Sequence, residues 1–176
     1  MRLPSSGMTK LLFAALALAL SWPSHAAEIV ARVVRVADGD SITVLDATKE
    51  QHKIRFAGID APERKQPFGN SSKQNLARYV AGKEVRLDCP KVDRYRRKVC
   101  KVWVQPADCP RCGKTLNVGL AQVTDGMAWW YQHYAKEQSP EDRGRYESAE
   151  QEARLRKLGL WQDNDPVPPW EWRRKR

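Results

Sequence analysis

The sequence predicts an α+β fold in which a five-stranded β-barrel of the OB-fold type carries about three helices. Three strand-like segments lie between residues 28 and 59, separated by the turn sequences ADGDS and ATKEQ. A segment with helical spacing follows, and two further strand-like segments come after it. This order suits a small closed barrel, because closure leaves no strand edge unpaired.

The first three strands show the clearest alternation of apolar and polar residues. They cover residues 28–36 (EIVARVVRV), 41–46 (SITVLD) and 52–59 (HKIRFAGI). The apolar face of such a meander needs a cover. Residues 68–83 can supply it as a helix, since Leu76, Tyr79 and Val80 have helical spacing and Gly82 is placed as a C-terminal cap.

The second half of the chain predicts two more strands and two helices. Residues 83–89 (KEVRLDC) and 97–106 (RKVCKVWVQP) are typical of strands. Residues 116–126 (LNVGLAQVTDG) have the apolar spacing of a short helix, and residues 127–134 (MAWWYQHY) form a short strand or an extended segment. A last helix begins at Ser139 with a capping-box arrangement and continues to Trp161.

Two terminal segments lie outside the predicted domain, which spans residues 27–163. Residues 164–176 are rich in proline, tryptophan and arginine, and we expect a poorly ordered extension that Trp170 or Trp172 would clamp. Residues 1–26 combine basic residues, a short apolar run and a small-x-small site, which predicts a signal peptide cleaved after Ala26. An uncleaved anchor is the alternative. We therefore expect a secreted or periplasmic protein with no stable membrane association after cleavage.

The charge of the chain favours a polyanionic partner. The formal net charge is +10, and it stays at +8 without residues 1–26, which contain two basic residues and no acidic one. A basic surface attracts nucleic acid, although it can also serve only solubility.

Four cysteines lie in the part of the chain after the signal peptide. In an oxidising compartment an even number indicates disulfides, and we favour Cys89 with Cys100 and Cys109 with Cys112. The first pair would join two successive strands, and the second would close the loop CPRC. A four-thiolate zinc site remains open, because CPRC resembles a zinc knuckle.

Two acidic clusters stand out against the basic background. Asp38 and Asp40 lie in the first hairpin turn, and Asp60 and Glu63 follow the third strand. These positions belong to the same end of a meander, so the four carboxylates can converge. Hard oxygen ligands favour Ca²⁺ or Mg²⁺. Alternatively, Asp-Gly-Asp is only a turn sequence, and Arg55 only forms a salt bridge to Asp60 or Glu63.

A third cluster is DRYRRKV, residues 93–99, which leads into the fifth strand. Cations that neutralise charge on phosphorus and an aromatic ring that holds a nucleotide are what a phosphodiester site requires beside a metal. A solvated basic hairpin is the alternative for this segment taken alone.

Together, DGDSITV, IRFAGIDAPE and DRYRRKV resemble the motifs of the staphylococcal (micrococcal) nuclease family in order and spacing. The resemblance extends from about residue 29 to 161. It implies Ca²⁺ ligands at Asp40, Asp60 and the backbone carbonyl of Ala61, with Asp38 behind them. It also implies catalytic roles for Arg55, Glu63 and Arg97.

The resemblance further implies nucleotide contacts from Arg94 and Tyr95, and from Tyr131 or Tyr134. Three positions depart from the family pattern, and one of them, Ser41 in place of the usual threonine, is a mild change. Ala61 replaces a frequent threonine, which a carbonyl ligand tolerates, and Arg96 stands where glycine is common before the catalytic arginine. A residue other than glycine there can alter the turn that places Arg97.

The expected function is that of a monomeric Ca²⁺-dependent endonuclease that hydrolyses DNA and RNA with little sequence preference and leaves 3′-phosphate ends. The main alternative is a non-catalytic OB-fold protein that binds nucleic acid. A cysteine-based zinc protein or redox factor is a third class, and neither His52 nor His133 lies near the cysteines in the sequence.

Overall fold

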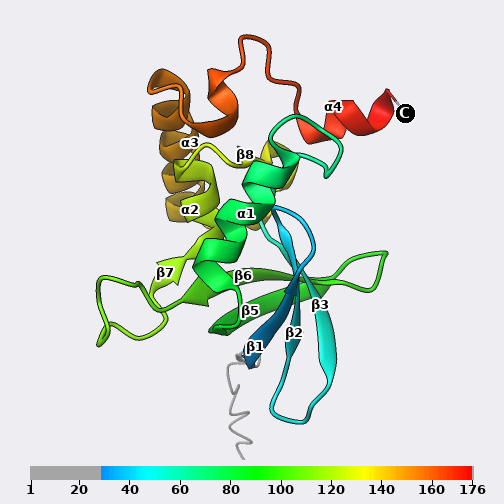
Figure 1. Cartoon of the computed structure of the whole chain (residues 1–176), viewed down its shortest axis with the longest axis vertical. Coiled ribbons are helices and arrows are strands. Elements are labelled where there is room, and N and C mark those ends of the chain that lie inside the picture. Colours follow the sequence, from blue (N-terminus) through cyan, green and yellow to red (C-terminus); the bar gives the residue numbers. More distant parts are fainter. Residues whose placement is uncertain (1–28, 176) are drawn as a thin grey trace, which may run out of the picture.

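The computed structural model describes residues 29–175, with a β-barrel in one half of the molecule and helices in the other (Figure 1). The barrel strands are β1 (Ile29–Val36), β2 (Ser41–Leu45), β3 (Gln51–Phe56), β5 (Glu84–Val92) and β6 (Lys98–Val104). They lie in the order β3-β2-β1-β5-β6, and a parallel pairing of β3 with β6 closes the barrel. The predicted five-stranded barrel is confirmed.

Two short strand pairs extend this barrel. β7 (Leu116–Asn117) pairs with the end of β6. β4 (Ile59–Asp60) pairs with β8 (Trp129–Trp130), which links the chain after β3 to the helical half. The short strand expected within residues 127–134 is therefore present.

The barrel interior follows from alternation along the strands. Ile42 and Val44 of β2 and Ile54 and Phe56 of β3 are all buried, and Ile42 lies opposite Ile54 in the register. Side chains of a strand point alternately to its two faces, so the residues between them face outward. A slip of one residue would exchange the two sets, which makes this register strongly specified.

The first predicted helix is α1 (Gly69–Val80), which lies between the barrel and the other helices in Figure 1. Leu76 and Val80 are fully buried, as the apolar spacing predicts. After the helix, Gly82 adopts a left-handed φ of 68°, which suits its expected role as a cap.

The later helices follow the prediction in position but not in length. α2 covers Val118–Thr124 and begins after Leu116, because that residue pairs with β6 instead. α3 (Pro140–Leu155) begins as expected, with the Ser139 side chain accepting a hydrogen bond from the Asp142 amide. It stops well before Trp161. Two 3-10 helices flank α3 in the sequence. η1 (Gln132–Glu137) precedes it and η2 (Gly159–Gln162) follows it.

The expectation of a poorly ordered C-terminal extension is wrong. Residues Pro169–Arg174 form the short helix α4. Pro169 is buried, and the ring of Trp170 lies edge-on to Trp129 with 6.4 Å between centroids. These contacts hold the segment against the domain, with Trp170 in the clamping position that the sequence led us to expect of Trp170 or Trp172.

Both predicted disulfides are present, Cys89–Cys100 and Cys109–Cys112. Cys100 is completely buried in β6, so the first disulfide lies in the barrel wall. All four cysteines are thereby paired, which leaves no thiolate for the alternative zinc site.

The proposed signal peptide and its cleavage site after Ala26 lie outside the described residues. Within residues 29–175, no helix has the length and apolar character needed to cross a membrane.

A buried polar network connects the helices to the first hairpin turn. The Gln122 side-chain amide of α2 donates to the Gly39 carbonyl at 2.7 Å, and its oxygen accepts from the Asn75 amide at 2.7 Å. Gln122 also donates to the Ser72 carbonyl at 3.2 Å. All three side chains are buried, so their polar atoms depend on one another rather than on water.

Replacing Gln122 by leucine should therefore destabilise the protein. The change leaves the Gly39 carbonyl and the Asn75 amide without this partner, and buried groups that lose a partner cost about 1–3 kcal/mol each. We expect the free energy of unfolding in urea to fall by about 2–4 kcal/mol. Gln162→Leu, at an exposed position of η2, is the matched control and should change it by less than about 0.5 kcal/mol. Equal effects of the two changes would contradict the role of the network.

Candidate active site

A cleft of about 920 Å³ opens where the β1–β2 turn, β4 and the β5–β6 turn meet. Every residue that the sequence singled out for metal, catalysis or substrate lines it. They are Asp38, Asp40, Arg55, Asp60, Ala61, Glu63, Arg94, Tyr95, Arg97, Tyr131 and Tyr134. Three motifs that lie far apart in the sequence thus share one cavity.

Arg55 joins two of the acidic segments. One of its terminal nitrogens, Nη1, lies 2.6 Å from Asp40 Oδ2, and the other, Nη2, lies 2.8 Å from Asp60 Oδ1. Asp60 is 1% exposed and the Arg55 side chain 14%. The arginine in the strand therefore balances carboxylates on both sides of it, and not only the Asp60 or Glu63 partner expected from the sequence.

The Asp38-Gly39-Asp40 turn is more than a generic turn. The Asp40 carboxylate also accepts hydrogen bonds from the Ala61 amide at 2.7 Å and from the Ser41 hydroxyl at 3.0 Å. A Cβ atom on Gly39 would lie 1.9 Å from Ser72 Oγ, so only glycine fits against α1. The turn is therefore held in place from both sides.

Burial and mutual repulsion make the negative charge of this cluster costly. Burial, followed by the charge of Asp40, raises the pKa of Asp38 to about 7. Burial also raises the pKa of Asp60, against the opposing effect of Arg173 and Arg55. Carboxylates in such surroundings favour a bound cation.

Glu63 lies on the loop after β4, which folds onto itself. The Glu63 amide donates to the Gln66 side-chain oxygen at 3.0 Å, and the Gln66 amide donates back to the Glu63 carbonyl at 2.8 Å. A Cβ atom on Gly69 would lie 2.1 Å from that same carbonyl. The Glu63 side chain remains 39% exposed in the cleft, where it can reach a substrate or water.

The β5–β6 turn is organised by Asp93. Its carboxylate accepts hydrogen bonds from the amides of Tyr95 and Arg97, both at 2.9 Å, and from Arg97 Nε at 2.8 Å. Burial raises the pKa of Asp93, but these hydrogen bonds and the Arg97 charge outweigh it, so the pKa lies below its ordinary value of 3.8. Arg97 is thereby held at the edge of the cleft.

Arg96 adopts a left-handed φ of 62°, the conformation that glycine favours. The sequence left open whether an arginine there changes the turn. In the structure the backbone takes the glycine-like conformation all the same, and the Arg96 amide donates to the Asp93 carbonyl at 3.0 Å. Arg97 follows it, directly before β6 begins at Lys98.

The aromatic residues Tyr131 and Tyr134 also line the cleft. The Tyr131 ring stacks on Trp170 with centroids 5.3 Å apart, and on His133 at 5.8 Å. Tyr134 lies edge-on to Tyr131 at 5.2 Å. Burial, followed by the charge of Asp60, raises the pKa of Tyr131. The negative charge of Asp60 therefore disfavours ionisation of the Tyr131 hydroxyl.

Similarity to known proteins agrees with this arrangement. Residues 53–163 match the family described as staphylococcal nuclease homologue. The chain belongs to the staphylococcal nuclease family. It is 41% identical over 149 residues to Protein ParB of Escherichia coli, an alignment that covers 85% of this chain and 81% of that protein. It is also 41% identical over 163 residues to the micrococcal nuclease of Shigella flexneri, covering 92% and 89%. An uncharacterized endonuclease of Escherichia coli O157:H7 is 40% identical over 156 residues, covering 89% and 92%.

The motifs of the staphylococcal nuclease family did not point to two residues at or near the cleft. Arg173 of α4 reaches Asp60 and Glu63, and the buried Gln66 supports the Glu63 loop. The basic sequence WEWRRKR contains Arg173 but gave no indication which arginine points inward. Gln66 lies between two charged or turn-like residues and looks like an ordinary loop residue.

This member of the staphylococcal nuclease family has another acidic group, which lies outside the cleft. Across residues 29–175, Asp46, Glu50 and His52 are the group of three with ligand atoms within 4.8 Å of one another. They lie at the end of β2 and β3 opposite to the cleft. Asp46 already accepts hydrogen bonds from Thr48, Glu50 and His52, which explains their proximity without an ion.

The conformation of Arg96 leads to a prediction about stability. A β-branched residue is strained at a positive φ, whereas glycine is not. Arg96→Val should therefore lower the free energy of unfolding by about 1–2 kcal/mol relative to Arg96→Gly, measured by urea denaturation. If the two variants were equally stable, the turn would not hold the left-handed conformation in solution.

The lowered pKa of Asp93 predicts a pH dependence. A carboxyl group whose pKa falls on folding stabilises the folded state above its unfolded pKa, and this contribution disappears as the pH falls through the folded pKa. The stability difference between the wild type and Asp93→Asn should be constant above about pH 5 and shrink below about pH 4, measured by denaturation at each pH. A difference that stayed constant to about pH 2 would contradict it.

Proposed function

We propose that this protein is a Ca²⁺-dependent endonuclease that hydrolyses phosphodiester bonds of DNA and RNA with little sequence specificity. The observation that carries the proposal is the bridge from Arg55 to Asp40 and Asp60 in the same cleft as Glu63 and Arg97. Acidic oxygens that can hold a metal and guanidinium groups that can hold a phosphate lie side by side there. Membership of the staphylococcal nuclease family supports the same reaction.

The donor set of the cleft fits a hard divalent cation. Asp40 and Asp60 are buried carboxylates, and the backbone of Ala61 lies against Asp40 through its amide. The raised pKa of Asp38 and of Asp60 reflects negative charge that a cation would neutralise. Ca²⁺ would be held by Asp40, Asp60 and the Ala61 carbonyl, and when bound it supplies Lewis-acid polarisation of a phosphoryl oxygen.

Glu63 is the group that acts on water. Its carboxylate is partly exposed in the cleft, and it would orient the attacking water or accept its proton. Water adds to phosphorus, and the bond to the 5′ oxygen breaks. The products are a 3′-phosphate end and a 5′-hydroxyl end. Arg55 and Arg97 would stabilise the charge that accumulates on the phosphoryl oxygens.

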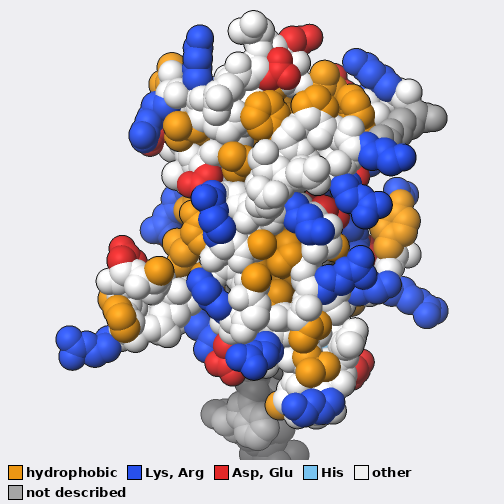
Figure 2. Space-filling model, in the orientation of Figure 1, with side chains coloured by type: hydrophobic (Ala, Val, Ile, Leu, Met, Phe, Trp, Pro, Cys, Tyr) orange, Lys and Arg blue, Asp and Glu red, His pale blue; other side chains and the backbone are white. Residues whose placement is uncertain are grey.

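Substrate recognition would rest on charge and on aromatic rings. Arg94 and the exposed Tyr95 lie on the β5–β6 turn, and Tyr131 lines the same cleft. Lys and Arg side chains predominate over acidic ones on the face shown in Figure 2, and the chain has 31 basic and 21 acidic residues. Contacts of this kind bind the nucleic acid backbone without reading bases, which suits low sequence specificity.

We further propose that the enzyme acts as a monomer outside the cytoplasm, secreted or periplasmic. The pattern of residues 1–26 and the pairing of all four cysteines support export. After removal of the signal peptide, no stable attachment to a membrane is expected.

The test of this function is cleavage of plasmid DNA and of RNA by the purified protein with Ca²⁺ and with a chelator. Glu63→Gln should lower kcat by about 10²–10⁴-fold, because it removes the acid–base group, while binding of DNA changes by less than about threefold. Glu147→Gln, on the exposed face of α3, is the matched control and should cleave like the wild type.

Two results would overturn the proposal. Cleavage that continues at full rate in the chelator would exclude a dependence on Ca²⁺. Full activity of both Glu63→Gln and Arg55→Ala would remove the cleft from the reaction. Tight binding of nucleic acid without cleavage would instead favour a non-catalytic binding protein.

A further inference from the structure

Arg173 of α4 extends into the candidate cation site. Its Nη2 atom lies 2.7 Å from Asp60 Oδ2, and its Nη1 atom lies 3.2 Å from Asp60 Oδ1. The same Nη1 atom donates to Glu63 Oε1 at 2.8 Å. Since Arg55 also donates to Asp60 Oδ1, both oxygens of this buried carboxylate are engaged by guanidinium groups. Arg173 thus contacts both the proposed metal ligand Asp60 and the proposed catalytic carboxylate Glu63.

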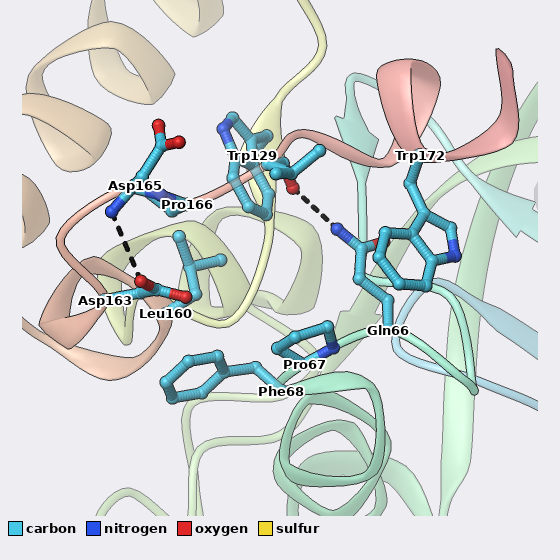
Figure 3. Close-up of a pocket in the computed structure, with 10 residues that line it drawn as sticks. Gln66, Pro67, Phe68, Trp129, Leu160, Asp163, Asp165, Pro166 and Trp172 are labelled. Atoms are coloured by element: carbon cyan, nitrogen blue, oxygen red, sulfur yellow. Dashed lines mark hydrogen bonds between the residues drawn. The ribbon is translucent and has the colours of Figure 1, made fainter. Parts of the chain in front are cut away.

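The short helix that carries Arg173 is fixed in position by its neighbours. A helix of six residues has little stability of its own. Trp170 stacks on Tyr131, and the Gln66 side-chain amide donates to the Val167 carbonyl at 2.6 Å. Figure 3 shows this hydrogen bond beside Trp172, on the wall of a small pocket of about 50 Å³. The backbone before Arg173 is therefore anchored next to the Glu63 loop.

The side chain of Arg173 is less constrained than its backbone. It is 45% exposed, whereas Asp60 is 1% exposed. A long exposed side chain can leave Asp60 by rotation about its own bonds, without any movement of Trp170 or of Gln66. The geometry therefore allows Arg173 to come and go while α4 stays in place.

A divalent cation and the guanidinium of Arg173 would compete for the carboxylate oxygens of Asp60. Ca²⁺ binds carboxylate oxygens at about 2.3–2.6 Å, and Arg173 uses both oxygens of Asp60. Sharing one oxygen would bring the two positive groups within about 5 Å of each other, where like charges repel. Occupation of Asp60 by one therefore disfavours occupation by the other.

We infer that Arg173 sets the cation affinity of the site, as an internal counter-ion that competes with the divalent cation for Asp60. This inference rests on the proposed function, which assigns a cation to Asp40 and Asp60. Cation binding then displaces Arg173 from Asp60, and the guanidinium stays within reach of Glu63. By linkage, Arg173 weakens the binding of the divalent cation to Asp60 by the same factor as the divalent cation weakens the contact of Arg173 with Asp60.

The experiment is a calorimetric titration of the purified protein with Ca²⁺. Arg173→Gln should bind Ca²⁺ at least about tenfold more tightly than the wild type, because the competing group is gone. Arg174→Gln removes the same charge from the next, exposed position of α4 and should change the affinity by less than about twofold. Arg173→Lys keeps the charge but loses the fork, and its affinity should lie between those of the wild type and Arg173→Gln.

A second measurement covers the case in which Arg173→Gln is less stable. Without the guanidinium, Asp60 and Glu63 repel each other, so Ca²⁺ should raise the melting temperature of Arg173→Gln more than that of the wild type. Equal affinities of Arg173→Gln and Arg174→Gln, with equal thermal shifts, would overturn the competition. So would undetectable binding by all variants up to about 10 mM Ca²⁺.

Failure of this inference is distinct from failure of the proposed function. DNA cleavage that requires Ca²⁺ and Glu63, together with an affinity that does not respond to Arg173, would retain the nuclease and reject the counter-ion. Tighter Ca²⁺ binding by Arg173→Gln without any DNA cleavage would reject the nuclease and retain the competition at Asp60.

Discussion

The bridge from Arg55 to Asp40 and Asp60 is the interaction on which the rest of the site depends. It ties three separate segments, the β1–β2 turn, β3 and β4, at one end of the barrel. Because removing one partner of a buried ion pair costs about 3–5 kcal/mol, the pairing fixes these segments more firmly than a surface salt bridge would. The register in which Ser41 lies opposite Arg55 serves the same end, since a slip by one residue would turn the arginine to the other face. The register of β2 against β3 and the assembly of the cleft therefore depend on each other.

Local pattern explains why so much of the fold was predictable. Alternation identified the barrel strands, and the Ser139 cap identified the start of α3, because each signal arises from neighbouring residues. The order of the strands then placed both acidic clusters at one end of the barrel. The predicted end of α3 was wrong, since Lys157 takes a left-handed φ of 51° just after Leu155 and the Leu158 amide donates back to the Ala153 carbonyl at 2.9 Å. A lysine rarely adopts this conformation, so the sequence carried no local signal for the end of the helix. Beyond it, the Leu160 amide donates to the carbonyl of residue 126, which is distant in the sequence.

Polar residues inside the helical half were beyond prediction for a related reason. Asn75 and Gln122 interrupt apolar patterns and look like surface positions, yet they are buried and bonded to each other. Their stabilising hydrogen bonds form only when α1 and α2 pack together next to the Gly39 carbonyl. A similar compensation explains Arg96, whose left-handed backbone costs about 1–3 kcal/mol and is offset by the hydrogen bonds that Asp93 accepts around it. In both places a rule broken locally is satisfied by a partner elsewhere.

The C-terminal segment is the strongest example, because its contacts span more than one hundred residues of sequence. Gln66 lies 101 residues from Val167 and Arg173 lies 113 residues from Asp60, so no window of the sequence contains both partners. Gln66 holds the Glu63 loop with its oxygen and the C-terminal segment with its amide, so the two segments form one unit. Seven carboxylates line the cleft, and two of them, Asp60 and Glu63, share Arg173. Buried charge must be balanced locally. A segment that was expected to be poorly ordered therefore supplies, through Arg173, part of the positive charge that neutralises Asp60 and Glu63.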